Sequence, residues 1–340
     1  EIGVRLVGSE MCIRDRSGLT LDVEQKVLIT GFNGELGSKI VKKLVELNKK
    51  VIAIDINDSN EKIDSVTYIK DSILNYELIN SIFTTNYITE VYHFAALLSQ
   101  TASKNPKIAM QVNEDASRNL IDCAYKNAVH NNVITKFFFP SSIAVYGPRK
   151  IKFASEQDII KPTTIYGNNK LAIEQYGSRI HEKSNLKICG LDFRSIRFPG
   201  VISYDTIPSG GTTDYASQMI HAALKGQHFN CKLLPETSLP FISINKTISS
   251  IIKLMSFENI NSILRAFNVE ETNFTVMELS DILRQKFPTF TVSFNEDKKF
   301  QSVADTWPSS LNCENSKKYW KFSSNIKLEE FLDKIIEKAK

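Results

Sequence analysis

The chain has 340 residues, of which 42% are hydrophobic and 24% charged, a balance typical of a globular protein with a large core. Its formal net charge of +4 comes from lysines scattered among acids, as in residues 329–338, which indicates solvated faces and not a nucleic-acid stripe. The five cysteines are odd in number and widely spaced, so they predict neither a disulfide framework nor a zinc site. No apolar run approaches the roughly 20 residues that span a bilayer. We therefore expect no nucleic-acid or membrane partner, and a cytoplasmic or other reducing compartment, which in a eukaryote includes the mitochondrial matrix.

Residues 1–24 differ from the rest of the chain. They show no clear strand or helix period, and Glu1, Glu10 and Asp15 are unlike the acid-poor composition of an organelle signal. The apolar centre of a secretory peptide is also missing. We expect residues 1–24 to be a leader outside the fold, disordered or artefactual.

The first predicted unit is a strand, a tight turn and a helix. The apolar run 26–30 ends at Gly31, and apolar residues then recur at helical spacing over residues 40–47. Gly31 permits the turn, Gly34 lets the backbone approach a pyrophosphate, and Gly37 lets the helix lie close to the strand. An ordinary strand-to-helix turn is the alternative. The cofactor contacts predicted here are Gly31, Phe32, Asn33, Gly34, Glu35, Leu36 and Gly37.

The second predicted strand, residues 51–55, favours the cofactor interpretation because it ends in an acid. Asp55 follows Gly31 at close to the spacing of about 20 residues expected for a carboxylate that binds the ribose 2′-hydroxyl. A 2′-phosphate would be repelled by this carboxylate, and no arginine follows it in residues 56–60. The predicted cofactor is therefore NAD.

Strands and helices alternate along the following residues. Strands are predicted at 66–69, 90–96, 136–142 and 186–198, and long helices at 106–129 and 165–183. This order predicts an α/β fold with a Rossmann-type, doubly wound parallel sheet and a smaller C-terminal substrate-binding lobe. We expect an NAD-binding domain at 25–200 plus 241–270, and a substrate lobe at 201–240 plus 271–340. Further cofactor contacts are predicted at Asp71, Ser72, Ile73, Ala95, Ala96, Leu97, Asn113 and Pro199, with either Asp71 or Ser72 meeting the adenine.

Three residues predict an alcohol-oxidising site. Tyr166 lies four residues before Lys170, so both side chains share one helix face, and Ser142 ends the strand 136–142. Lowering the tyrosine pKa from about 10 to near neutrality requires roughly 4 kcal/mol. A cation about 4 Å away at an effective dielectric constant of about 20 supplies that amount. We expect Tyr166 to act as the base, whereas His93, inside an apolar strand, and Tyr146 are predicted to be structural.

These motifs resemble those of a known family. The glycine turn, Ser142, the Tyr166/Lys170 pair and Arg197-Phe-Pro-Gly are similar to the extended short-chain dehydrogenases/reductases. Within this family, residues 93–99, 191–203, 306–308 and above all Gly210-Gly-Thr-Thr-Asp-Tyr-Ala216 resemble the short-chain type of L-threonine 3-dehydrogenases. The likeness extends from Lys26 to the last helix.

The resemblance implies oxidation of the β-hydroxyl of L-threonine to 2-amino-3-oxobutanoate, with NAD taking the hydride. Tyr166 would take the hydroxyl proton, while Lys170 would lower its pKa and hold the nicotinamide ribose. Asp214 would pair with the substrate ammonium, although it could instead cap the next helix. Thr213 and backbone amides are candidate partners for the substrate carboxylate, and Arg194 is a less favoured one. Ser141 is a less favoured substitute for Ser142. The substrate contacts implied by the family are Ser99, Ser142, Tyr166, Thr212, Thr213 and Asp214.

The family also implies a homodimer formed through the helices 106–129 and 165–183. Seven apolar or aromatic side chains on these helices extend beyond one narrow stripe, so one face of each helix should pack on the sheet while another is available for a second subunit. They are Ile108, Val112, Leu120, Ile121, Leu171, Ile173 and Tyr176. The alternative is that all seven are covered within one subunit.

Some positions depart from the family pattern, and two other functions stay open. Ser243 and Lys246 stand where the family usually has a tyrosine and an aspartate, so Asn245 is expected to cap the following helix. A sugar-nucleotide epimerase or dehydratase would use the same catalytic residues. A non-catalytic NAD-binding regulator would be expected to have lost Ser142, Tyr166 or Lys170, and all three are present.

Overall fold

The computed structural model describes residues 12–14, 20–22, 24–59, 61–147, 151–208, 211–258, 260, 262–324 and 326–339. Of the predicted leader, it describes two short antiparallel strands, β1 (Cys12–Arg14) and β2 (Thr20–Asp22), and residue 24. The other leader residues lie outside the described residues, so the prediction for them stays a prediction.

The central element is a seven-stranded sheet with the order β13-β9-β7-β6-β3-β4-β5. Four neighbouring pairs of these strands run parallel: β3 with β4, β3 with β6, β4 with β5, and β13 with β9. The predicted Rossmann-type α/β fold is confirmed. The strands are β3 (Gln25–Thr30), β4 (Lys50–Asp55), β5 (Val66–Lys70), β6 (Tyr87–His93), β7 (Ile134–Ser142), β9 (Gly190–Phe198) and β13 (Ala266–Asn268).

The other strands of the described residues form smaller sheets. A three-stranded sheet contains β10 (Gly200–Ile202), β12 (Ser238–Ser243) and β14 (Thr272–Thr275). Two parallel pairs are β11 (His228–Cys231) with β15 (Thr291–Phe294), and β8 (Phe153–Ala154) with β16 (Ser310–Leu311).

The helices agree with the predicted alternation. They are α1 (Glu35–Glu46), α2 (Tyr76–Thr85), α3 (Ser99–Lys104), α4 (Pro106–Ala109), α5 (Ser117–His130), α6 (Ile165–Lys183), α7 (Tyr215–Leu224), α8 (Ile244–Ser256), α9 (Val276–Lys286), α10 (Lys298–Ala304), α11 (Glu314–Trp320) and α12 (Leu328–Ala339), with a π-helix η1 (Met110–Ala116) and a 3₁₀ turn η2 (Ile143–Val145). No helix in the described part of the chain is both long and apolar enough to cross a membrane.

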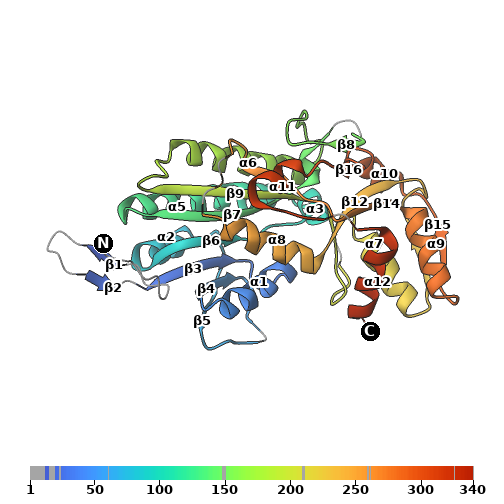
Figure 1. Cartoon of the computed structure of the whole chain (residues 1–340), viewed down its shortest axis with the longest axis horizontal. Coiled ribbons are helices and arrows are strands. Elements are labelled where there is room, and N and C mark those ends of the chain that lie inside the picture. The colour runs from blue at the N-terminus through green and yellow to red at the C-terminus, as the bar shows by residue number, and fades with distance from the viewer. Residues whose placement is uncertain are drawn as a thin grey trace, which may run out of the picture. The chain divides into compact units, whose positions relative to one another are not determined.

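The chain forms two compact units. The first contains residues Glu1–Phe94, Asn119–Phe137 and Ile180–Asp192, and the second contains Ala95–Arg118, Phe138–Arg179 and Phe193–Lys340. In the first unit β3, β4, β5 and β6 lie side by side, and α1 packs against β3 and β4 (Figure 1). These boundaries do not test the predicted division into a cofactor domain and a substrate lobe.

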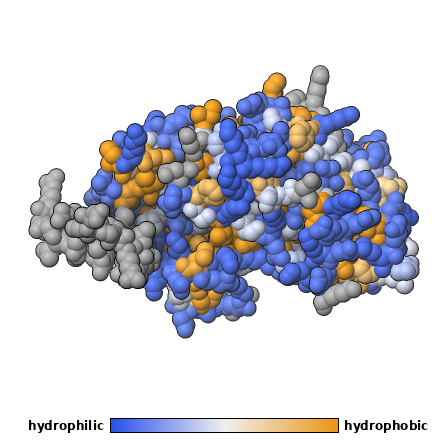
Figure 2. All heavy atoms as spheres, in the orientation of Figure 1, coloured by the Kyte–Doolittle hydropathy of each residue, from blue (hydrophilic) through white to orange (hydrophobic). Residues whose placement is uncertain are grey.

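Apolar patterning explains the strands. Every residue of β9 is buried, as is typical of a parallel strand covered on both faces, and Val27, Leu28 and Ile29 fill the core at β3. On the face drawn in Figure 2, hydrophilic residues predominate and hydrophobic residues form separate small areas. Burial of the apolar side chains on these strands therefore forms the hydrophobic core.

Three predicted details are corrected. The strand predicted at 90–96 ends at His93, after which Phe94–Leu98 leave the sheet. The helix predicted at 106–129 is interrupted by the π-helix η1. Ser243, not Asn245, caps α8, because the Ser243 hydroxyl accepts from Lys246 N at 3.3 Å whereas Asn245 accepts from Tyr204 Oη.

Candidate functional site

The glycine turn in the first unit has a shape that only glycines permit. Gly31 has a φ of +73°, and its N–H donates to Ile54 O at 2.8 Å, which fixes the turn to β4. A Cβ at Gly37 would lie 2.2 Å from Gly31 O, so the start of α1 approaches the turn too closely for any side chain. The turn therefore fits a pyrophosphate held by backbone amides at the N-terminus of α1.

The Asp55 carboxylate lies at this turn. It accepts hydrogen bonds from Asn33 N and Asn57 N, both at 3.0 Å, so the acid and the turn are held together. A cavity of about 230 Å³ opens beside them, and the cation in its lining, Lys42, is paired with Glu61 at 2.8 Å. A 2′-phosphate would meet Asp55 and a lysine that is already neutralised. These residues fit NAD.

Other predicted residues of the first unit have local contacts. Asp71 accepts from Ser72 N at 2.6 Å and from Asn75 Nδ2 at 3.0 Å, and Ile73 is buried. Which of Asp71 and Ser72 meets the adenine therefore stays open. His93 is buried and shares a 2.7 Å hydrogen bond with the Thr30 hydroxyl, which confirms its structural role.

In the second unit, Asn113 holds the loop that follows β6. Its side chain accepts from Leu97 N at 2.8 Å and donates to Leu97 O at 3.0 Å, which shapes the Ala95–Leu97 segment. It also donates to Asn169 Oδ1 on α6 at 3.3 Å. Asn113 sits inside the π-helix η1, a feature that often marks functional sites. Its predicted contact with the cofactor, like that of the buried Pro199, stays a prediction.

Ser142 is more accessible than Ser141. Ser142 is the last residue of β7, partly exposed, and its hydroxyl accepts from Ala144 N at 3.1 Å at the start of η2. Ser141 is buried and its hydroxyl donates to the Glu174 carboxylate. The side chain of Ser141 is thus committed to the protein interior, and the alternative to Ser142 is not supported.

Tyr166 and Lys170 lie one turn apart on α6, as the sequence predicts. The Lys170 ammonium donates to Pro140 O at 2.6 Å and lies 5.4 Å from the centre of the Tyr166 ring and 4.6 Å from that of Phe139. Pro140, the residue before Ser141, is therefore joined to the second turn of α6.

The protonation behaviour of this pair differs from the prediction. Burial lowers the pKa of Lys170 to about 7, and the nearby Glu174 opposes this shift. Desolvation raises the pKa of Tyr166 above its ordinary value, although part of the residue is exposed. Desolvation therefore outweighs the lowering of the Tyr166 pKa that was expected from the Lys170 ammonium.

Gly167 sets how closely α6 approaches η2. A Cβ at this position would lie 2.1 Å from Ala144 O, so no side chain fits. We expect Gly167→Ala to displace the start of α6, and Tyr166 with it, which lowers turnover at least about tenfold and the free energy of unfolding by about 1–3 kcal/mol. Kinetics and urea unfolding would measure both effects, with the exposed Asn168→Ala as control. Wild-type values for Gly167→Ala would show that the close approach is unnecessary.

The predicted substrate residues 212–214 form a compact loop before α7. Gly211 N donates to Asp214 Oδ2 at 2.7 Å, and Thr212 is buried. Asp214 occupies the N-cap position of α7 but makes no side-chain capping bond, so the capping alternative is not supported. Thr213 is partly exposed, as is Ser99, which begins α3. Gly210 lies outside the described residues.

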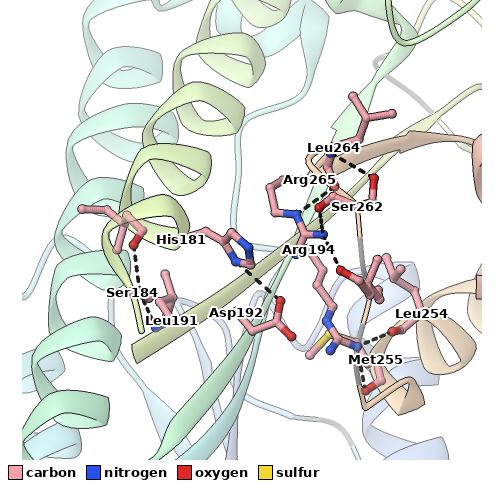
Figure 3. A network of polar contacts seen from close by, with 12 residues as sticks. His181, Ser184, Leu191, Asp192, Arg194, Leu254, Met255, Ser262, Leu264 and Arg265 are labelled. Carbon is pink, nitrogen blue, oxygen red and sulfur yellow. Dashed lines mark hydrogen bonds and ion pairs between the residues drawn. The ribbon is translucent and has the colours of Figure 1, made fainter. Parts of the chain in front are cut away.

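Arg194 is a structural residue. It is fully buried, and its guanidinium donates to Leu254 O at 2.6 Å and to Met255 O at 3.3 Å, where α8 ends (Figure 3). A cation suits the carbonyls at a helix C-terminus. The proposed alternative role of Arg194 with a substrate carboxylate is therefore not supported.

The sequence interpretation missed two charged residues behind Lys170. Arg197 on β9 and Glu174 on α6 form a buried ion pair with a shortest distance of 2.8 Å. A visible signal was available: Glu174 follows Lys170 by four residues, and thus lies on the same helix face, while Arg197 stands between the apolar residues Ile196 and Phe198 of a predicted strand.

A family model described as the NAD dependent epimerase/dehydratase family matches residues 27–259. The mitochondrial L-threonine 3-dehydrogenase of Bos taurus is 33% identical over 317 residues, which are 92% of this chain and 82% of the relative. A Staphylococcus haemolyticus protein described as an uncharacterized epimerase/dehydratase is 31% identical over 310 residues, 89% of this chain and 94% of the relative.

A solved structure extends the likeness to three dimensions. The apo form of a monomeric L-threonine 3-dehydrogenase from a metagenome superposes with a TM-score of 0.82 at 30% identity, covering 92% of this chain and 98% of that one. The resemblance drawn from the glycine turn, Ser142, Tyr166 and Lys170 is confirmed at the family level. The chain is a member of the NAD-dependent epimerase/dehydratase family, the extended short-chain dehydrogenases/reductases, and an NAD-dependent enzyme similar to the L-threonine 3-dehydrogenases.

Proposed function

We propose that the protein oxidises the β-hydroxyl of L-threonine to a ketone, giving 2-amino-3-oxobutanoate. The observation that carries the proposal is the fit of α6 against the end of β7, where Gly167 meets Ala144 O and Lys170 bonds to Pro140 O. We infer that this fit fixes the position of Tyr166 relative to Ser142. The 211–214 loop and the similarity to threonine dehydrogenases support threonine as the substrate.

Different residues would bind different parts of NAD. In the first unit, the turn Gly31–Gly37 would hold the pyrophosphate of NAD, and Asp55 would replace its bonds to backbone amides with bonds to the ribose hydroxyls. In the second unit, Lys170 would hold the nicotinamide ribose and Asn113 would keep the Ala95–Leu97 loop in shape. Bound NAD supplies the acceptor for the hydride that leaves the β-carbon.

The chain's own groups manage the proton and the orientation. Ser142 would donate a hydrogen bond to the substrate hydroxyl oxygen, and Tyr166 would accept the hydroxyl proton as the carbon–oxygen double bond forms. Positive charge near the phenol must offset the desolvation that raises the pKa of Tyr166, and the Lys170 ammonium is placed to supply it. Asp214 would pair with the substrate ammonium.

We expect the purified protein to reduce NAD in the presence of L-threonine, with at least about a tenfold lower kcat/KM when NADP replaces NAD. The reason is that Asp55 and Glu61 would face the 2′-phosphate while Lys42 is already paired. Absorbance of the reduced cofactor measures both reactions. Equal activity with both cofactors would contradict the role assigned to Asp55. The variant Asp55→Ala should reduce the ratio of kcat/KM with NAD to kcat/KM with NADP.

The same assay separates the other functions. Incubation with a UDP-sugar tests the epimerase and dehydratase alternative, whose supporting observation is the family match itself. Product formation from the UDP-sugar and none from threonine would overturn the substrate assignment. NAD binding without turnover of either compound would instead favour a regulator.

We also propose a homodimer formed through the helices α4 to α5 and α6. Ile108 and Met110 expose 49% and 50% of their surface, which leaves an apolar area for a partner. Leu120, Ile121 and Ile173 are buried within the chain, as expected for the face of each helix that packs on the sheet. Arg118 stacks on the Tyr176 ring at 4.8 Å, so these helices also pair within one subunit.

Sedimentation at micromolar concentration should give about twice the chain mass of 38.5 kDa. The double variant Ile108→Asp/Met110→Asp should give the single-chain mass, because two buried carboxylates at an apolar contact are costly. A fully active wild-type species of single-chain mass, like the monomeric relative, would end the dimer proposal.

A further inference from the structure

A buried pair of opposite charges lies directly behind the catalytic residues of the second unit. The side chains of Glu174 and Arg197 are each 5% exposed, and Arg197 Nη2 and Nε donate to the two carboxylate oxygens at 2.8 and 3.0 Å. Removing two charges from water costs free energy that their mutual attraction often fails to recover. The burial of this ion pair is thus weak evidence that its role is to stabilise the fold. Its position in the structure says more about its role.

The pair is bonded to the strand end that carries Ser142. Glu174 accepts a hydrogen bond from the Ser141 hydroxyl, and one helical turn earlier Lys170 donates to Pro140 O at 2.6 Å. Two successive residues of β7 are therefore fastened to two successive turns of α6. Because Ser142 follows on the strand and Tyr166 precedes on the helix, these bonds fix the two relative to each other.

Arg197 extends the same connection to the far side of Ser142. Its Nη1 donates to Tyr146 Oη at 3.1 Å, and Tyr146 donates to Asn268 Oδ1 at 2.8 Å. Tyr146 directly follows η2, the turn that Ser142 begins and against which Gly167 packs. The arginine thus holds the segment after Ser142 while the glutamate holds the segment before it.

The charges of this cluster also bear on Lys170. The titratable groups of the cluster are Tyr166, Lys170 and Glu174 on α6, Arg197 on β9 and Tyr146 after η2, whereas β7 offers the Pro140 carbonyl, the Ser141 hydroxyl and the Phe139 ring. Burial lowers the pKa of Lys170 to about 7 and Glu174 opposes that shift. Without the glutamate, Arg197 would lose its buried partner and Lys170 would lose the charge that opposes the fall in its pKa.

We propose that Glu174 is a positioning residue for the oxidation: it aligns the Ser142 strand end with the Tyr166 helix and supplies the counter-charge that keeps Lys170 protonated, while Arg197 fixes its carboxylate. The proposal rests on the proposed function for its catalytic consequence. Its electrostatic part concerns the cofactor-free protein alone. The two parts can therefore be tested separately.

Glu174→Gln keeps the shape of the side chain and removes its charge. We expect kcat with threonine to fall about tenfold or more while KM changes less, because positioning and not binding is lost. Activity needs the Lys170 ammonium, which is lost as pH rises through its pKa. Removing the negative charge of Glu174 lowers the Lys170 pKa further, so the ammonium is lost at lower pH. The alkaline limb of the kcat profile should therefore move to lower pH by about one unit.

A second readout uses neither substrate nor cofactor. The folded pKa of Lys170 lies below its unfolded value of about 10.4, so the unfolded chain binds more protons between these values. The free energy of unfolding from urea titrations should therefore rise with pH from about 7 towards 10.4, and fall as pH drops through this window. In Glu174→Gln the rise should begin at lower pH.

The double variant Glu174→Gln/Arg197→Met separates charge from packing. It removes both charges of the pair, so the alkaline limb and the unfolding curve should stay where Glu174→Gln puts them, because the lost influence on Lys170 is that of Glu174 itself. Ser141→Ala removes one hydrogen bond without changing charge, so it should lower kcat and leave the limb in place. A Glu174→Gln protein with unmoved limb and unmoved unfolding curve overturns the proposal, as does a double variant whose limb returns to the wild-type position. Lack of wild-type turnover with threonine would instead reject the proposed function, since the unfolding curve needs no substrate.

Discussion

Replacing Tyr166 by phenylalanine should lower turnover with threonine by on the order of 10²-fold or more, because the ring stays while the proton acceptor is lost. Tyr166 makes its close contacts through the ring, which lies 5.4 Å from the Lys170 ammonium, so the fold and the position of Lys170 should be unchanged. NAD affinity should therefore stay within about twofold of wild type, since the proposed ribose contact comes from Lys170. The expected pattern is a loss in kcat without a matching loss in cofactor binding.

The measurement pairs steady-state kinetics with cofactor titration by protein fluorescence or calorimetry. Tyr319→Phe is a matched control because it removes another tyrosine hydroxyl of the second unit, on a different helix, α11. It should keep wild-type turnover. Near-native turnover in Tyr166→Phe would show that another group accepts the proton, and the assigned mechanism would be wrong.

The fold and the cofactor turn could be predicted because local sequence determines them. The alternation of apolar strands and amphipathic helices fixes a parallel sheet, and Gly31 and Gly37 have backbone requirements that only glycine meets. The bond from Asn33 N to Asp55 also follows from chain order, since the turn after β3 and the end of β4 lie on neighbouring parallel strands. Each of these features depends on residues close in sequence or on adjacent strands.

The arrangement around Lys170 could not be predicted, because it depends on where side chains from distant segments meet. The helical spacing placed Lys170 beside Tyr166, but the ammonium bonds to Pro140 O, 30 residues away in sequence. The Glu174–Arg197 pair joins a helix to a strand 23 residues away. Only the packing of α6 on the sheet decides which carbonyl or carboxylate each cation meets.

The π-helix within the predicted helix 106–129 could not be predicted for the same reason. The wider turns of η1 shift the face that the 3.6-residue period predicts. The period alone therefore does not say which apolar residues of this helix are covered within the chain: Leu120 and Ile121 are buried, whereas Ile108, before the π-helix, is exposed.

Removing the Lys170 ammonium should have a larger effect than removing the Tyr166 hydroxyl, because two steps lose support. Lys170→Met keeps much of the buried volume, and we expect kcat/KM to fall by about 10³-fold or more, with the NAD dissociation constant raised about tenfold. The loss in affinity reflects the proposed ribose contact, and the loss in turnover reflects a phenol whose pKa is already raised by desolvation and no longer has a nearby cation. Lys187→Ala, an exposed lysine of the first unit, is the control and should behave as wild type.

The stability of Lys170→Met distinguishes a catalytic effect from misfolding. The substitution removes the hydrogen bond to Pro140 O but also removes a cation whose pKa burial lowers to about 7, so the two contributions to the free energy of unfolding oppose each other. We expect a folded protein whose urea midpoint at pH 7 is close to that of wild type. Its unfolding free energy should also lose the rise between about pH 7 and 10.4 that the lysine produces. Wild-type NAD affinity and turnover in this folded variant would contradict both roles assigned to Lys170, whereas weakened NAD binding with normal turnover would retain the ribose contact and reject the electrostatic one.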